Sequence, residues 1–105
     1  MTESGFRARL SSGGTLVLPY EEAVRAIDEL THAGMRVERW EGLVVLRDGT
    51  QARSLQFGGS FALSRDPVRA ASVATAAMGR AREEWNRKPE FEGAQLHYVL
   101  TFGKV

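Results

Sequence analysis

The sequence predicts an α+β fold: a mostly antiparallel β-sheet with two helices packed on one face, in the order β-β-α-β-β-β-(β)-α-β. Two segments repeat apolar residues at three- and four-residue spacing, which is typical of amphipathic helices. Several shorter segments alternate apolar and polar residues, which is typical of half-buried strands. Short turns between those strands favour antiparallel pairing. With 105 residues, the chain is predicted to form a single domain over residues 1–105.

A hairpin is predicted at the start of the chain. Apolar residues alternate with two arginines over residues 6–10, and a Ser-Ser-Gly-Gly turn separates them from a second short strand at residues 15–18. Two such runs joined by a glycine-containing turn are typical of paired antiparallel strands. Residues 6–18 are therefore expected to pair with each other.

The clearest helix is predicted directly after this hairpin. Pro19 suits the first turn of a helix, where its missing N–H costs nothing, and the acidic Glu21 and Glu22 complement the positive end of the helix dipole. Gly34 suits a left-handed cap and is expected to end the helix. The apolar stripe of this helix consists of Tyr20, Ala23, Val24, Ile27 and Leu30.

A meander of three strands is predicted next, covering residues 35–40, 43–46 and 50–57. Glu41-Gly42 is expected to be a turn or a bulge between the first two strands. Asp48-Gly49 predicts a tight hairpin, because this pair readily reaches the positive φ angles of primed turns. After Gly58-Gly59, residues 60–64 are expected to form a brief further strand.

A second helix and a final strand complete the predicted order. Asp66 followed by Pro67 is a typical helix start, an N-cap acceptor before proline at the first helical position. The apolar spacing continues over residues 67–88, and Pro89 is expected to stop the helix. Residues 95–102 alternate strictly and predict the last strand.

Composition narrows the classes of function. The net charge of +1 is too balanced to indicate a nucleic-acid or membrane-surface partner. The absence of cysteine excludes disulfides and thiolate chemistry. The first residues lack the pattern of a secretory signal, and no apolar stretch approaches the ~18 residues of a membrane span. The protein is therefore expected to be soluble and cytoplasmic, with no membrane partner.

The sequence offers few groups that carry chemistry. Its two histidines are far apart in the chain: His32 is explained by the dipole at a helix end, and His97 lies on the polar side of its strand. No serine motif or phosphate loop is present, and the adjacent acids of the helices point about 100° apart. We therefore expect no enzyme activity, no catalytic or metal-binding residues and no cofactor.

The segment with the strongest indication of binding is residues 36–42. Strict alternation places Arg36, Glu38 and Trp40 on one face of their strand, and Glu41 follows. Tryptophan and arginine are enriched at the energetic centres of protein interfaces. The predicted partner-binding residues are Trp40, Glu41, Arg36, Glu38 and Arg53. The alternative interpretation is that Trp40 covers the core while the charged residues form cross-strand pairs.

The run from Pro19 to Gly49 resembles small immunity proteins of bacterial polymorphic-toxin and contact-dependent inhibition systems. The resemblance covers about a third of the chain and depends on four pieces: Tyr20-Glu21-Glu22-Ala23, a helix end at Ala33-Gly34, Trp40-Glu41-Gly42 and Asp48-Gly49. It implies a compact, non-enzymatic protein that neutralises one cognate toxin by occluding its active site. No toxin-contacting residue follows from the resemblance.

The leading hypothesis is thus a protein-binding module, with toxin immunity as its most specific form. One alternative is a small-molecule-binding accessory protein or small enzyme with a pocket between sheet and helices. Another is a nucleic-acid-binding protein, suggested by a basic cluster that two acids interrupt. That cluster consists of Arg80, Arg82, Arg87 and Lys88. Strand order and oligomeric state stay open.

Overall fold

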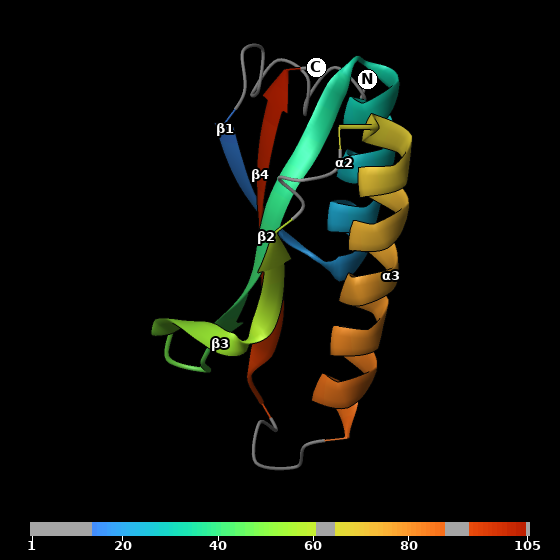
Figure 1. Ribbon diagram of the computed structural model, residues 1–105. Coiled ribbons are helices and arrows are strands. Elements are labelled where there is room, and N and C mark those ends of the chain that lie inside the picture. The colour runs from blue at the N-terminus through green and yellow to red at the C-terminus, as the bar shows by residue number, and fades with distance from the viewer. Residues whose placement is uncertain (1–13, 61–64, 88–92, 105) are drawn as a thin grey trace.

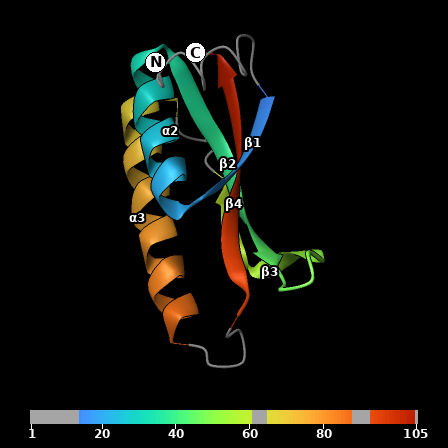
Figure 2. The ribbon, with the colours of Figure 1, turned by 180° about the vertical axis from the view of Figure 1, so that it is seen from behind.

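The computed structural model describes residues 14–60, 65–87 and 93–104. They form a four-stranded antiparallel sheet with both helices on one face, so the predicted α+β fold is confirmed (Figures 1 and 2). The elements are β1 (Gly14–Pro19), α2 (Tyr20–His32), β2 (Met35–Val45), β3 (Gln51–Ser60), α3 (Pro67–Asn86) and β4 (Gln95–Lys104). The strand predicted at residues 6–10, and residues 61–64 of the brief strand, lie outside the described residues.

The strand order in the sheet is β1-β4-β2-β3. Because β4 is antiparallel to both β1 and β2, those two strands run parallel with β4 between them, and α2 connects them. Likewise β3 and β4 run parallel with β2 between them, and α3 connects them. Two interleaved crossovers therefore place both helices over the same side of the sheet (Figure 2).

The prediction of three strands between residues 35 and 57 is wrong, because β2 is one continuous strand of 11 residues. It contains a bulge that the sequence analysis missed: Val37 pairs with Phe102 and Arg39 with Thr101, which leaves Glu38 as an extra residue opposite β4. The irregularity expected at Glu41-Gly42 is present as a register shift against β3. The strand runs through it without turning.

The hairpin predicted at Asp48-Gly49 is confirmed, but its turn is not a primed one. Among the described residues only glycines have positive φ, so Asp48 does not adopt it, whereas Gly49 does with φ of 92°. The Gly49 N–H donates to the Leu46 carbonyl oxygen at 2.9 Å. The Thr50 N–H donates to Asp48 Oδ1 at 2.9 Å, and this bond lowers the pKa of the Asp48 carboxyl.

The helix boundaries follow local capping chemistry. Pro19 is the N-cap of α2, so this helix begins one residue later than predicted. α3 begins at Pro67 as predicted, and the Val68 N–H donates to Asp66 Oδ1 at 3.1 Å. α3 ends at Asn86, before the predicted residue 88.

Among the described residues, no helix is long and apolar enough to cross a membrane.

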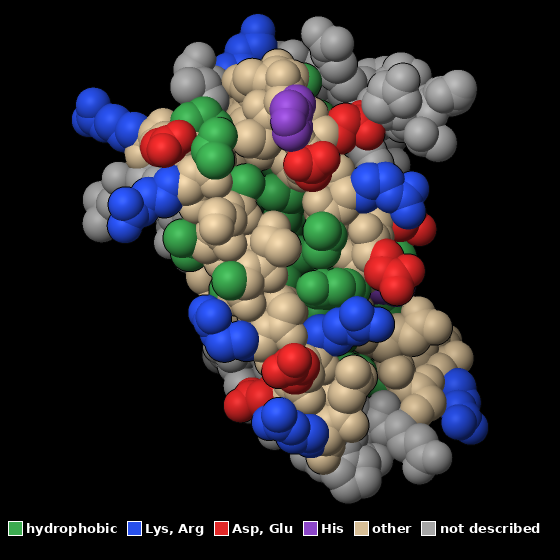
Figure 3. Space-filling model, turned by 90° about the vertical axis from the view of Figure 1, so that its right-hand side faces the viewer, with side chains coloured by type: hydrophobic (Ala, Val, Ile, Leu, Met, Phe, Trp, Pro, Cys, Tyr) green, Lys and Arg blue, Asp and Glu red, His purple; other side chains and the backbone are tan. Residues whose placement is uncertain are grey.

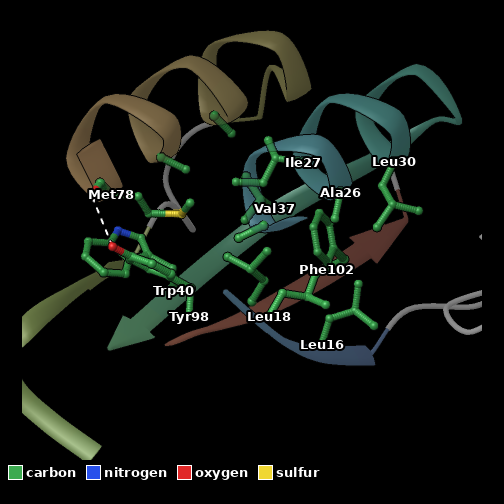
Figure 4. Close-up of a cluster of buried hydrophobic side chains, with 14 of the residues drawn as sticks. Leu16, Leu18, Ala26, Ile27, Leu30, Val37, Trp40, Met78, Tyr98 and Phe102 are labelled. Atoms are coloured by element: carbon green, nitrogen blue, oxygen red, sulfur yellow. Dashed lines mark hydrogen bonds between the residues drawn. The ribbon is translucent and has the colours of Figure 1, made fainter. Parts of the chain in front are cut away.

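The core lies between the sheet and the two helices (Figure 4). Alternate residues of β1, β2 and β4 point toward the helices, and α3 meets them mainly with alanines, which let the helix approach the sheet closely. Tyr98 is the largest of the fully buried side chains in the described part of the chain, and its hydroxyl donates to the Met78 carbonyl oxygen at 3.4 Å. Its ring centroid lies 5.7 Å from that of Trp40.

Candidate functional site

The described residues show no cluster suited to bind a metal ion. They contain no group of three or more His, Cys, Asp or Glu side chains that is suited to hold a metal ion. His32 lies in the last turn of α2, where its Nδ1 is 2.8 Å from the Asp28 carbonyl oxygen. His97 is half-buried in β4, paired with Pro19 on one side and Leu43 on the other. The candidate site described below is a face of the sheet.

The helix-free face is the sheet surface opposite α2 and α3 (Figures 1 and 2). Alternation and register assign to it Thr15 and Val17 of β1, His97, Val99, Thr101 and Gly103 of β4, and Arg36, Glu38, Arg39, Glu41, Leu43 and Val45 of β2. Leu43 and Val99 are buried, yet they stand outside the main core cluster. Val17, on the described edge of the sheet, is 47% exposed. Apolar and charged side chains thus lie next to each other on this face.

Two arginine–glutamate pairs follow each other along β2 on the helix-free face. Arg39 Nη2 lies 2.5 Å from Glu41 Oε2, and Arg36 Nη2 lies 3.5 Å from Glu38 Oε2. Each pair joins residues two apart, which point to the same side of a strand. The Arg39 side chain is 55% exposed and the Glu38 side chain 38% exposed, so both pairs are reachable from solvent.

Gly103 of β4 makes room for one of these pairs. It is the cross-strand partner of Arg36, and the Glu38 carboxylate occupies the place that a Cβ at residue 103 would take. Any side chain at this position would push Glu38 away from Arg36. The position of the carboxylate therefore depends on a glycine in the neighbouring strand.

The bulge at Glu38 decides which side chains share a face. Strict alternation would keep Trp40 on the side of Arg36 and Glu38, and that prediction is wrong. The extra residue shifts the phase of β2, so that Met35, Val37 and Trp40 all point into the core. The charged side chains that flank them stay on the opposite side.

Trp40 is consequently a core residue. It is 3% exposed, and its indole Nε1 finds no hydrogen-bond acceptor among the described residues. The alternative interpretation, that Trp40 covers the core, is the one that its burial supports. The ion pairs of Arg36 and Arg39 described above run along β2, to Glu38 and Glu41.

Three of the five predicted contact residues meet on the helix-free face, namely Arg36, Glu38 and Glu41. Arg53 pairs through its backbone with Leu43, and its side chain lies outside the described residues. Arg39 is not among the predicted contact residues, because strict alternation places it on the face opposite Arg36 and Glu38. Its spacing of two from Glu41 is the sequence signal that identifies it.

Three cavities that described residues line are open to solvent on the helix-covered side. One of about 440 Å³ lies beside Trp40 and Gly58 under the second half of α3, and Glu83, Glu84 and two arginines line it. One of about 740 Å³ lies between α2 and α3, where hydrophobic side chains gather along the furrow and charged ones stand at its rims (Figure 3). The third, of about 330 Å³, lies at the end of α3.

No protein-family model, curated protein or solved structure matches this chain. The geometry of the described residues is therefore the basis for the functional argument that follows.

Proposed function

We propose that the chain is a non-enzymatic protein-binding module that docks a partner protein on the helix-free face of its sheet. In its most specific form, the partner is a toxin domain whose active site the chain covers. The observation that carries the proposal is the row of two ion pairs, Arg36–Glu38 and Arg39–Glu41, beside apolar residues on the sheet face opposite the described helices α2 and α3.

The occupant that fits this face is a protein surface carrying both an acid and a base. The Arg39–Glu41 pair is exposed, and exposed ion pairs contribute only ~0–1 kcal/mol to folding, so Arg39 can turn to a charge on a partner protein at little cost. Arg39 and Glu41 hold each other in place before binding, which lowers the entropy lost when a partner is bound. A partner with charges in the complementary order then gains specificity, because a wrong order places like charges together.

Neutralisation of a toxin tests the proposal. A toxin domain encoded next to the gene for this chain is expressed in bacterial cells alone, with the wild-type chain, and with the charge-swapped variant R39E/E41R. The swap keeps an ion pair on the helix-free face but reverses its polarity. We expect the wild-type chain to restore growth and the swapped chain to fail, with binding to the purified toxin domain weakened at least ~10-fold.

A second charge swap serves as the matched control. Arg25 and Asp28 are both exposed on α2, on the other side of the molecule. The variant R25D/D28R also leaves the net charge unchanged, and it should restore growth like the wild-type chain. The proposal fails if the wild-type chain does not protect the cells, or if R39E/E41R protects them equally well.

A further inference from the structure

The cavity of about 330 Å³ lies where the start of α2, the last turns of α3 and the start of β4 meet. This volume falls at the lower end of the range of about 300–1,000 Å³ that is typical of small-molecule sites. The side chains that give the cavity its chemistry are Tyr20, Arg82, Trp85 and Asn86. Aromatic walls and several polar groups therefore converge on one small space.

The positively charged side chain of Arg82 is held in position at the edge of this cavity. The Arg82 guanidinium lies over the Tyr20 ring, with Cζ 4.5 Å from the ring centroid. The Tyr20 ring in turn meets Tyr98 edge-on, at a centroid distance of 5.8 Å. Because Tyr98 is fully buried in the core, this stack places Arg82 on a rigid base although the arginine itself is exposed.

The charge of the lining distinguishes this cavity from the other two. Glu83 and Glu84 line the cavity beside Trp40, and Glu21 and Asp28 line the one between the helices. No carboxylate is among the described residues that line the cavity at the end of α3, whereas Arg82 is. Of the three linings, this is the one in which the described residues present a guanidinium and no carboxylate to a bound anion.

We propose that this cavity binds a small planar aromatic carboxylate. The carboxylate pairs with Arg82, whose planar guanidinium suits bidentate contact with it. The aromatic ring lies against the wall that contains Tyr20 and Trp85, while the amide of Asn86 supplies a polar contact. The site is separate from the ion pairs of the helix-free face, so it stands independently of the proposed protein partner.

Benzoate is the probe, and benzyl alcohol is its uncharged counterpart of similar size and shape. The full chain is labelled with ¹⁵N and titrated with each compound while amide and indole shifts are recorded. We expect benzoate to move the Trp85 indole signal and the amides of residues 94–98, with a dissociation constant of ~1 mM or lower. Benzyl alcohol should bind at least ~10-fold more weakly, because it lacks the charge that Arg82 recognises.

The variant R82Q should weaken benzoate binding at least ~10-fold and leave benzyl alcohol binding unchanged. Arg69 is exposed on the same helix and does not line the cavity, so R69Q is the matched control and should bind benzoate like the wild-type chain. The spectra also report whether each variant is folded. Equal binding of both compounds, unchanged binding by R82Q, or shifts confined to the cavity beside Trp40 would each overturn the proposal.

Discussion

The phenol of Tyr98 lies at the centre of the molecule, where an ionised oxygen would stand among apolar side chains. Burial raises the pKa of Tyr98 from 10.0 to about 12. Above pH 10 the unfolded chain loses this proton while the folded chain keeps it, so folding stability falls as the pH rises. The stabilisation is fully present below pH 10 and is lost between pH 10 and about 12.

Replacing Tyr98 by phenylalanine removes this titration. Between pH 9.5 and 12 the wild-type free energy of unfolding should fall more steeply than that of Y98F, by as much as ~2–3 kcal/mol over the range. Urea unfolding at stepped pH measures both slopes. At pH 7 the variant should also lose ~0.5–1.5 kcal/mol with the hydrogen bond to the Met78 carbonyl. Parallel slopes for the two proteins would show that Tyr98 does not titrate in this way.

The close approach of Gly103 and Glu38 can be tested by substituting each of the two residues. G103A introduces a Cβ where the Glu38 carboxylate lies, but that carboxylate is the flexible end of a side chain and can move. Alanine in a strand is favoured over glycine by ~0.5–1 kcal/mol, which offsets the cost of the displacement. We expect G103A to change the free energy of unfolding by less than ~1 kcal/mol while separating Arg36 from Glu38.

A double-mutant cycle tests whether a Cβ at residue 103 contacts the Glu38 carboxylate. In the E38A background the new methyl meets no carboxylate, so G103A should stabilise the protein by ~0.5–1 kcal/mol, more than it does in the wild-type background. Urea unfolding of the four proteins gives the coupling energy. An identical effect of G103A in both backgrounds would contradict the contact between these two residues.

At the scale of the element, the bulge in β2 should allow the protein to fold after Glu38 is deleted. Removing Glu38 leaves Val37 opposite Phe102 and Arg39 opposite Thr101, so the ladder with β4 closes without moving any side chain to the other face. The deletion variant should therefore fold, with the Trp40 fluorescence of a buried indole. Deleting Glu41 instead shifts the strand by one residue and forces Trp40 or Leu43 to the wrong face, so this variant should unfold.

The same bulge marks the limit of what sequence patterns predict. Helix starts such as Asp66-Pro67 and the alternation of β4 are local signals, and the elements that they predict are present. The extra residue at Glu38 is defined only by pairing with residues about 64 positions later in the chain, which alternation cannot detect. For this reason Trp40 was assigned to the wrong face, and the Arg39–Glu41 pair was missed.

At the scale of the whole molecule, β4 holds the sheet together. Among the described strands it is the one that pairs with β1, and it also pairs with β2 along most of its length. A fragment of residues 1–93 should therefore lack stable tertiary structure, because β1 and the apolar face of α2 lose their neighbour. Adding a peptide of residues 94–105 should restore the near-ultraviolet circular dichroism of the intact chain, and a scrambled peptide should not. A fragment that is fully folded without the peptide would contradict this.

The two arginines and two glutamates along β2 also determine how far this surface acts. Opposite charges only a few ångströms apart cancel over distance, and physiological salt screens the remainder beyond ~8 Å. This patch should therefore give little long-range electrostatic attraction to a partner protein. The association rate constant should be ~10⁵–10⁶ M⁻¹s⁻¹, as for proteins without electrostatic steering, and should change little with ionic strength. Discrimination between partners would then rest on how long each complex survives, not on how quickly it forms.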